Sequence, residues 1–416
     1  MNTPANSKIP AQALMAWLAC SIFYAYLYAM RTLPGMYVGG ISASMGIEIG
    51  TAAGLIGSYM LTYGLGNLVT GGLMDKYGAK WVIPAGPIFV GVGVLMFASG
   101  HYGLAYAGRL VMGFGCAFGF VGCGYLVGSL MPPTVLALFI GLSQAFGMGG
   151  GALGAQPLAS LLEAFGLNWQ SGMVACGLFG LVLAVLMLVA MPAKRKDDAK
   201  TASVPFGAAL WAVLKNPQAI RLGFIGAFMF TGTTVAASVL GMPFLVNLSH
   251  LDTPTAKTAV TLVSAGWVIG APLAGYVSDR IHARKPLLFI AIAGMAAISI
   301  FVRISDVATM ATELLFALGL LFGILSGSAM LTYTMAKESA DNALSGTASG
   351  VQNAWVFGIG FLISTGVAEL VKDVATDPAT HKLISVHQFQ QATLPILLGL
   401  GVAALLLSFT KETASK

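Results

Sequence analysis

Gly71-Gly72-Leu73-Met74-Asp75-Lys76-Tyr77-Gly78-Ala79-Lys80 separates two long apolar stretches and has a counterpart later in the chain. The counterpart, GYVSDRIHARK over residues 275–285, begins 204 positions after the first copy in a chain of 416 residues. Both copies place an aspartate and basic residues directly after an apolar stretch. A short charged loop at the same place in each half predicts a protein built from two related halves.

The sequence around these loops is apolar throughout. Hydrophobic residues make up 57% of the chain and charged residues 9%, whereas a soluble domain carries about 25% charge. This composition excludes a water-soluble globule, and long runs without alternation exclude a β-barrel. Stretches of about 20 apolar residues can cross a bilayer as helices. Twelve are predicted: 12–38, 51–73, 81–100, 103–131, 135–160, 169–191, 219–245, 256–277, 286–305, 309–335, 345–370 and 389–409.

We therefore expect an all-α integral membrane protein with twelve transmembrane helices in two pseudo-symmetric six-helix bundles. Residues 1–191 form the expected N-terminal bundle, 192–218 a cytoplasmic linker and 219–416 the C-terminal bundle. Within the linker, Phe206, Leu210, Trp211 and Leu214 share one side of a helix. This pattern predicts a short helix on the membrane surface; the alternative is that the stretch begins the seventh span.

Basic residues are unequally divided between the two sets of loops. With the N-terminus inside, fifteen Lys and Arg lie on the cytoplasmic side and four on the opposite side, which predicts that both termini are cytoplasmic. The short loops favour a bacterial inner membrane. Because the basic residues form no single cluster, no nucleic-acid partner is expected. The four cysteines form no CxxC pair, so neither a metal site nor a cofactor is expected.

The two loops resemble the motif G-x-L-x-D-x-x-G-x-[RK] of the major facilitator superfamily. The first copy matches every defining position, whereas the second has Val277 for the leucine and His282 where the second glycine usually stands. The resemblance implies a monomeric secondary transporter that sits in a lipid bilayer and binds a small-molecule substrate.

The resemblance also implies that the charges in these loops are gating residues that stabilise an outward-open state: Asp75, Lys80, Asp279 and Arg284. An acidic residue at a helix end can bridge to a neighbouring helix end and lose that bridge when the bundles tilt. The alternative is that these charges only end helices and fix the topology.

The fourth stretch contains Arg109-Leu110-Val111-Met112-Gly113, which is similar to the R-x-x-x-G motif of the same family. The resemblance implies a structural or coupling role for Arg109; its side chain could instead extend to the membrane surface. The fifth stretch has Gly151-Ala152 where drug exporters carry a Gly-Pro pair, which disfavours multidrug export.

Carboxylates and histidines lie in loops or near span ends, so the usual proton carriers are missing at the midplane. Coupling through a central Asp, Glu or His is therefore disfavoured. Exchange of one solute for another, a proton carried with the substrate, or no coupling remain. The same distribution leaves no nucleophile–base pair for an intramembrane enzyme, and no enzymatic activity is expected.

Arg31 lies inside the first predicted span. An arginine at the bilayer centre costs at least ~2.5–3.5 kcal/mol and usually faces the interior with a partner. On a helix, Tyr24 and Tyr28 share the face of Arg31, so the cation would stand beside phenol rings. Such a face suits an anionic solute, because a guanidinium can form paired bonds to a carboxylate or phosphate.

The position of Arg31 resembles that of the first-helix arginine of the anion:cation symporter and organophosphate-transporter branches, which binds the anionic group of the substrate. The second-half basic partner of some organophosphate exchangers is missing from the seventh span. This absence favours a small carboxylate over a phosphate ester. The alternative is that Arg31 lies at the outer interface and anchors the helix.

Other polar and aromatic residues fall in spans that line the cavity in this family and are further candidates for substrate contact: Tyr59, Tyr63, Gln144, Trp267, Tyr333, Gln352, Asn353 and Trp355. A mainly apolar pocket with a few placed polar groups is typical of a small-molecule site. Packing, or a place in the interfacial aromatic belt, is the alternative for each aromatic residue.

The leading hypothesis is transport of a small organic anion by alternating access. The alternatives keep the fold and change the substrate to a neutral or zwitterionic nutrient such as an amino acid, or to an exported amphiphilic drug or siderophore. A receptor is disfavoured because no long extramembrane segment could form an output domain, and no GxxxxGK[ST] motif supports ATP-driven pumping.

Overall fold

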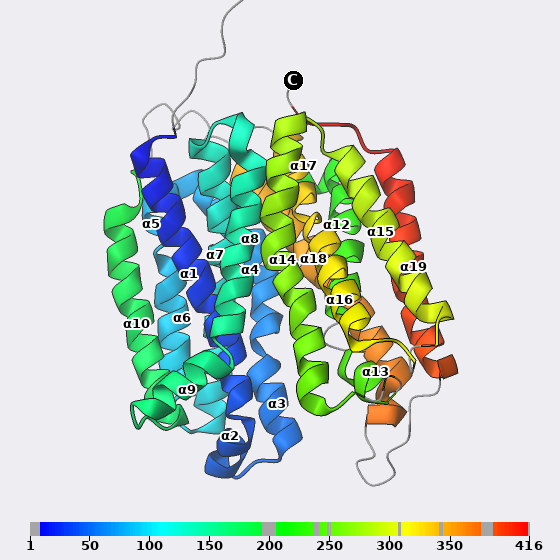
Figure 1. The fold of residues 1–416 in the computed structure, drawn as a ribbon. Coiled ribbons are helices and arrows are strands. Elements are labelled where there is room, and N and C mark those ends of the chain that lie inside the picture. Colours follow the sequence, from blue (N-terminus) through cyan, green and yellow to red (C-terminus); the bar gives the residue numbers. More distant parts are fainter. Residues whose placement is uncertain are drawn as a thin grey trace, which may run out of the picture. The chain divides into compact units, whose positions relative to one another are not determined.

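The computed structural model describes residues 9–193, 205–235, 241–247, 249, 251–306, 309–340, 344–375 and 386–414. Regular secondary structure within these ranges is entirely helical (Figure 1). The chain divides into two compact units. Unit 1 comprises Met1–Leu136, Phe146–Lys215 and Ala340–Ala354, and unit 2 comprises Ala137–Ala145, Asn216–Ser339 and Trp355–Lys416.

Unit 1 contains the first seven α-helices, a 3-10 turn and five further helices or parts of helices. In order they are α1 (Ala11–Met36), α2 (Val38–Met45), α3 (Ile49–Gly57), α4 (Tyr59–Tyr77), α5 (Ala79–Val82), α6 (Ala85–Phe97), α7 (Tyr102–Leu130), η1 (Pro133–Val135), both ends of α8 (Leu136–Leu153), α9 (Gln156–Ala164), α10 (Trp169–Ala190), α11 (Phe206–Lys215) and the beginning of α18 (Ser345–Ala375).

Unit 2 contains the middle of α8 and the remaining helices. They are α12 (Pro217–Thr234), α13 (Gly241–Asn247), α14 (Thr253–Ile281), α15 (Lys285–Ile304), α16 (Thr312–Gly327), α17 (Met330–Glu338), the rest of α18 and α19 (Val386–Ser408). Because parts of α8 and α18 group with the opposite half of the sequence, the bundle boundaries at residues 191 and 219 remain predictions.

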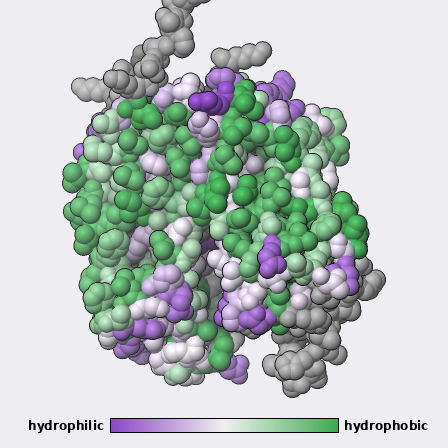
Figure 2. All heavy atoms as spheres, viewed as in Figure 1, coloured by the Kyte–Doolittle hydropathy of each residue, from purple (hydrophilic) through white to green (hydrophobic). Residues whose placement is uncertain are grey.

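Each of the twelve predicted stretches falls mainly on one or two helices, which confirms the all-helical fold. Among the described residues, eight helical segments are long and apolar enough to cross a membrane: Ala11–Met36, Ala79–Phe97, Tyr102–Leu130, Pro133–Leu153, Trp169–Ala190, Pro254–Ile281, Lys285–Ile304 and Thr312–Glu338. On the face drawn in Figure 2, hydrophobic side chains predominate, and hydrophilic ones gather toward its upper and lower ends. The total of twelve spans stays a prediction.

The helix starts follow from local capping chemistry. Asn168 accepts a hydrogen bond from the backbone N–H of Ser171 at 2.9 Å and so begins α10. Asn216 caps α12 in the same way, accepting from the N–H of Gln218 at 2.9 Å, and Pro217 follows at the first helical position. The Asn216 cap separates α11 from α12, so residues 206–215 form a helix of their own. Residues 194–204 of the predicted linker lie outside the described ranges.

Glycines allow the long helices to pack at close range within each unit. A Cβ on Gly113 of α7 would collide with the carbonyl oxygen of Tyr59 on α4. In unit 2, a Cβ on Gly323 of α16 would collide with the carbonyl oxygen of Val263 on α14. Small residues at such crossings are what hold membrane helices together, since lipid is as apolar as the side chains.

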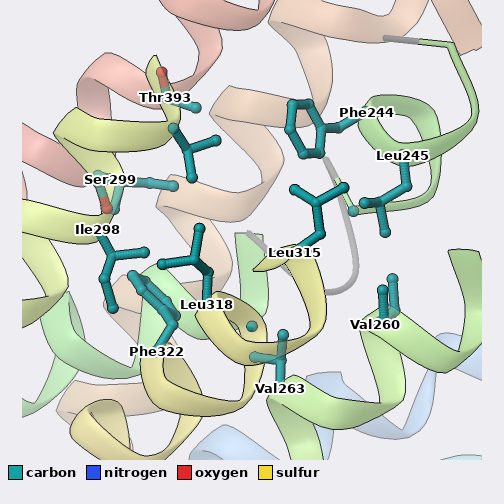
Figure 3. A pocket seen from close by; sticks show the side chains of 15 residues that line it. Phe244, Leu245, Val260, Val263, Ile298, Ser299, Leu315, Leu318, Phe322 and Thr393 are labelled. Carbon is teal, nitrogen blue, oxygen red and sulfur yellow. The ribbon is translucent and has the colours of Figure 1, made fainter. Parts of the chain in front are cut away.

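The helices of unit 2 also surround an apolar pocket (Figure 3). It is lined from α13, α14, α15, α16 and α19, with Phe244, Val263, Ile298, Leu315 and Phe322 among its walls. The pocket is partly open, and its volume of about 840 Å³ includes solvent space at the mouth.

The glycine contact makes a first prediction. Gly323→Ala is expected to lower the melting temperature of the purified protein by several degrees, because α16 must move away from α14 and overpacking typically costs about 1–3 kcal/mol. Gly358→Ala is the matched control: it is also helical, and a Cβ there meets nothing within 4 Å. The control is expected to leave the melting temperature unchanged or raise it slightly. Equal behaviour of the two variants would contradict the close crossing.

Candidate functional site

Arg31 of α1 is partly buried and stands against three tyrosine rings of unit 1. Its guanidinium carbon lies 4.4 Å from the ring centre of Tyr28, 5.1 Å from that of Tyr59 and 5.2 Å from that of Tyr63. The Nε of Arg31 donates a hydrogen bond of 2.9 Å to the hydroxyl of Tyr59. These contacts place the cation between α1 and α4, among buried side chains, with the negative faces of the rings toward it.

Helical spacing explains how the cluster forms. Tyr28 and Arg31 are three residues apart on α1, and Tyr59 and Tyr63 are four apart on α4, so each pair shares a helix face. The sequence predicted the first pair as one surface. That the second pair meets the first is decided by the packing of the helices.

Tyr24, another tyrosine predicted at the site, packs against Tyr28. It is fully buried, its ring lies edge-on to that of Tyr28 at 5.1 Å, and its hydroxyl donates a long hydrogen bond of 3.5 Å to the Tyr28 hydroxyl. Gly119 and Gly147 provide the space that its ring occupies.

Two side-chain amides, those of Asn353 and Asn67, are hydrogen-bonded beside Tyr63. The side-chain N–H₂ of Asn353 donates to the hydroxyl of Tyr63 at 3.0 Å and to the Oδ1 of Asn67 at 2.9 Å. Asn67 in turn donates from its own amide to the backbone carbonyl of Tyr63 at 2.9 Å. Asn353 was a sequence candidate, whereas Asn67 was missed; its position four residues after Tyr63 was the available signal. Gln352, the neighbour of Asn353, is also buried.

Arg109 of α7 is fully buried and bonds to the backbone of two other helices. Its Nη1 donates to the carbonyl of Met30 at 3.2 Å, and its Nε donates to the carbonyl of Ile56 at 2.9 Å. A second bond joins Nη2 to the same Ile56 carbonyl. Both acceptors need such a donor: Pro34 lacks the N–H that would bond Met30 within α1, and Ile56 lies in the last turn of α3.

The same guanidinium braces the tyrosine cluster. The Arg109 carbon lies 4.9 Å from the ring centre of Tyr59, which Arg31 also contacts. Arg109 thus ties α7 to the irregular points of α1 and of the second span, close to the cation of Arg31. These contacts of Arg109 are with other parts of the protein, as expected of a structural residue.

The bonds of Arg109 yield a second prediction. Arg109→Met is expected to lower the melting temperature markedly, because each buried carbonyl left without a donor costs about 1–3 kcal/mol. Arg109→Lys keeps the charge but lacks the planar fork that reaches both carbonyls, so it is expected to recover only part of the loss. The measurement is thermal unfolding of the purified protein in detergent. An unchanged melting temperature for Arg109→Met would rule out the bracing role.

The other sequence candidates belong to unit 2. Trp267 is fully buried, and its indole N–H donates to the hydroxyl of Thr233 at 3.0 Å. Thr233 donates to the hydroxyl of Ser326, which donates to the carbonyl of Met229 at 3.0 Å. This chain joins α12, α14 and α16, so the polar atom of Trp267 serves helix packing.

Trp355, on α18, stacks at 5.5 Å on Phe224 and packs on Gly223. Its indole nitrogen is buried and has no hydrogen-bond partner among the described residues. Gln144 of α8 and Tyr333 of α17 are buried within the same unit.

Asp75, at the end of α4, caps the beginning of α18. Its carboxylate accepts from the backbone N–H groups of Gly346 at 2.9 Å and Thr347 at 2.8 Å, and from the Thr347 hydroxyl at 2.6 Å. A carboxylate at a helix N-terminus satisfies otherwise unbonded N–H groups and interacts favourably with the helix dipole. Lys80 lies in the short helix α5 and is partly exposed.

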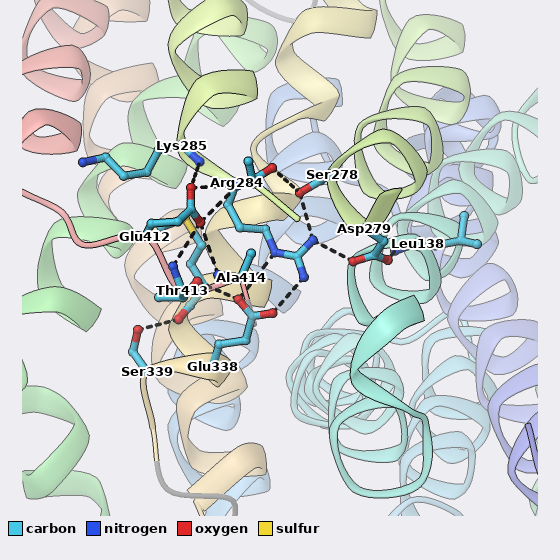
Figure 4. A network of polar contacts seen from close by, with 12 residues as sticks. Leu138, Ser278, Asp279, Arg284, Lys285, Glu338, Ser339, Glu412, Thr413 and Ala414 are labelled. Atoms are coloured by element: carbon cyan, nitrogen blue, oxygen red, sulfur yellow. Dashed lines mark hydrogen bonds and ion pairs between the residues drawn. The ribbon is translucent and has the colours of Figure 1, made fainter. Parts of the chain in front are cut away.

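Asp279, in the second loop, makes the equivalent contact with α8. Its Oδ2 accepts from the backbone N–H of Leu138 at 2.9 Å, while its Oδ1 pairs with Arg284 at 2.6 Å (Figure 4). Arg284 also pairs with Glu338 of α17 at 2.8 Å. His282, which replaces the second glycine of the motif, ends α14 in the left-handed region with φ 50°. The first loop uses Gly78 at φ 80° for the same purpose.

The segment after α19 joins this network (Figure 4). The carboxylate of Glu412 accepts from the backbone N–H groups of Arg284 and Lys285 at 3.0 Å and so caps α15. The hydroxyl of Thr413 donates to Glu338 at 2.6 Å. Sequence reasoning missed both Glu338 and Glu412, because nothing in their spacing connects them to the loop.

The Glu412 cap makes a third prediction. Burial raises the pKa of the Glu412 carboxyl, but the backbone N–H groups of Lys285, Ala414, Arg284 and Thr413 outweigh burial and lower that pKa below its ordinary value. The contribution to stability is therefore present above the pKa of the unfolded chain and is lost as pH falls through the lower folded pKa.

Glu412→Gln is expected to lower the melting temperature by roughly 1–2 °C at pH 7, with the difference from the unmodified protein shrinking below about pH 4. Melting curves of both proteins from pH 7 to 3.5 test this. If the difference in melting temperature between the two proteins grew on acidification, the pKa of Glu412 would not be lowered by folding, and the assignment of the cap would be wrong.

Three features together indicate a polytopic membrane transporter. They are a duplicated loop whose aspartate caps another helix, helices long and apolar enough to cross a bilayer, and a cation inside the first predicted span. The family model of the Major Facilitator Superfamily matches residues 18–365, and the chain belongs to that superfamily. It is a secondary transporter of this family and not an enzyme.

Similar proteins of known name include two curated bacterial relatives. Membrane sensor protein UhpC of Escherichia coli is 26% identical over 305 residues, which cover 68% of each chain. The 4-hydroxybenzoate transporter PcaK of Pseudomonas aeruginosa is 24% identical over 360 residues, which cover 78% of each chain. The crystal structure of the E. coli fucose:proton symporter FucP aligns with a TM-score of 0.71 at 17% identity, covering 96% of this chain and 99% of that one. This last likeness concerns the fold alone.

Proposed function

We propose that this transporter moves a small organic anion, a carboxylate, across the membrane by alternating access, with Arg31 as the anion-binding group. The observation that carries the proposal is the guanidinium of Arg31 held by Tyr28, Tyr59 and Tyr63 inside a predicted span. Phenols stabilise the cation without neutralising it, so a net positive charge is retained for a ligand.

The geometry suits a carboxylate in particular. The bond from Nε to Tyr59 fixes the plane of the guanidinium, and a planar fork in a fixed orientation favours paired bonds to two oxygens. Since the Tyr59 oxygen accepts that bond, its own proton can be donated to an oxyanion. Asn353, through Tyr63, holds the opposite side of the cluster in place.

The names of the relatives point the same way without deciding the substrate. PcaK is named for 4-hydroxybenzoate, an aromatic carboxylate, and an aromatic solute would suit a site walled by phenol rings. FucP is named for fucose, so a neutral solute is the comparison that the experiment must include.

The remaining expectations belong to this proposal. The protein would work as a monomer in a bacterial inner membrane, with twelve spans and both termini in the cytoplasm. The carboxylate caps of Asp75 on α18 and Asp279 on α8 would hold one state of the transport cycle and break in another, with Arg284 supporting Asp279. Gln144, Tyr333, Gln352 and Trp355 are proposed as cavity residues, and the buried indole N–H of Trp355 is a donor for a solute.

The fourth prediction concerns binding. Benzoate-type and short aliphatic carboxylates are expected to raise the melting temperature of the purified protein, since a ligand at 100 times its Kd stabilises by about 2.7 kcal/mol. Arg31→Gln should lose this shift, and Arg31→Lys should retain only part of it because an ammonium cannot pair with two oxygens. Amino acids, phosphate esters and fucose are expected to give smaller shifts.

Lys257→Gln, which removes an exposed cation of unit 2, serves as the control for net charge and should behave as the unmodified protein. Uptake of a labelled carboxylate into proteoliposomes then tests transport. If well-folded Arg31→Gln bound carboxylates as strongly as the unmodified protein, Arg31 would not be the anion site. If fucose alone stabilised the protein, a neutral solute would be the substrate instead of a carboxylate.

A further inference from the structure

The apolar pocket of unit 2 has a composition that does not suit a water-soluble substrate. Thirteen of its fifteen lining residues are apolar or glycine, and the other two are Ser299 and Thr393. Ser299 donates its hydroxyl to the carbonyl of Met295 in its own helix at 2.8 Å. The walls therefore present hydrocarbon, and moving a charged or strongly polar solute into them would leave its polar groups poorly compensated.

The cation of Arg303 stands next to this apolar wall. Arg303 donates from Nη1 to the hydroxyl of Thr393 at 3.2 Å, and Thr393 itself lines the pocket. Figure 3 shows the hydroxyls of Thr393 and Ser299 on one side of the pocket, with Phe244, Leu245 and Leu315 facing them. Arg303 lies in the last turn of α15, one residue before the helix ends at Ile304.

The lining residues follow the membrane helices for a few turns. On α16 they run from Leu315 to Phe322, seven residues or about 10 Å along that helix. The lining therefore lies within spans α14, α15 and α16. A cation near a helix end lies at the level of lipid headgroups.

We propose that this pocket holds one acyl chain of an anionic phospholipid, with the phosphate at Arg303. The apolar lining and the charge select this occupant: an apolar tail suits the hydrocarbon walls, and a negative head complements the guanidinium beside Thr393. The headgroup contact supplies the preference for an anionic lipid. The site is independent of the Arg31 cluster, which belongs to unit 1.

The test uses the full chain, purified in detergent and washed free of lipid. Phosphatidylglycerol and phosphatidylcholine with the same acyl chains are titrated while the melting temperature is followed, and bound lipid is counted by native mass spectrometry. Phosphatidylglycerol is expected to bind in a one-to-one complex and to raise the melting temperature more than phosphatidylcholine does. Arg303→Gln should weaken phosphatidylglycerol binding about fivefold, the effect of one charge near the headgroups.

Val260→Phe narrows the pocket from α14 and should abolish the saturable binding of both lipids. Ile300→Phe, which enlarges an exposed apolar side chain on the outside of α15, is the matched control and should bind as the unmodified protein does. Equal affinity for the two lipids, or unchanged affinity in Arg303→Gln, would overturn the headgroup assignment. Saturable binding that survives in folded Val260→Phe would overturn the pocket as the site of the chain.

Discussion

The cation of Arg31 constrains the first unit more than any other group, because a guanidinium cannot enter hydrocarbon without compensation. The chain surrounds it with the rings of Tyr28, Tyr59 and Tyr63. Contacts between a cation and the faces of aromatic rings are electrostatic. The buried Tyr24 and the amide pair of Asn67 and Asn353 bond to these tyrosines and so help to hold the rings in position.

The helices beside the rings are irregular, and irregular helices leave backbone carbonyls without partners within the helix. Pro34 leaves the carbonyl of Met30 without its partner, and α3 ends at Gly57 just before Tyr59. Arg109 satisfies both places from a third helix. In lipid each unbonded polar group costs several kcal/mol, so Arg109 stabilises the irregular points of both helices by bonding these carbonyls.

At the helix ends, the same electrostatic principle appears in duplicate. Asp75 and Asp279 each bond backbone N–H groups in the first turn of a helix far away in sequence: Asp75 bonds two of them in α18, and Asp279 bonds one in α8. The second copy makes additional contacts. Arg284 pairs with both Asp279 and Glu338, and Glu412 caps the start of α15 next to Arg284. Carboxylate caps of this kind are strong enough to order a helix end and weak enough to be exchanged in a conformational cycle.

Composition and helical periodicity were enough to predict the helical membrane fold, the duplicated loop and a cation beside tyrosines on one helix face. Those features depend on composition and on the period of a helix, which are local properties. The sequence also brought Asn353 into consideration, although only as one polar residue in a span. Packing between helices decided the remaining contacts. It brings Tyr59 and Tyr63 to Arg31, and Asn353 to Tyr63. It also lets Arg109 bond two distant carbonyls, Trp267 donate to Thr233 and Glu412 cap α15. Contacts between helices tens or hundreds of residues apart depend on which faces approach and on where small residues permit close crossings, and no local pattern carries that information.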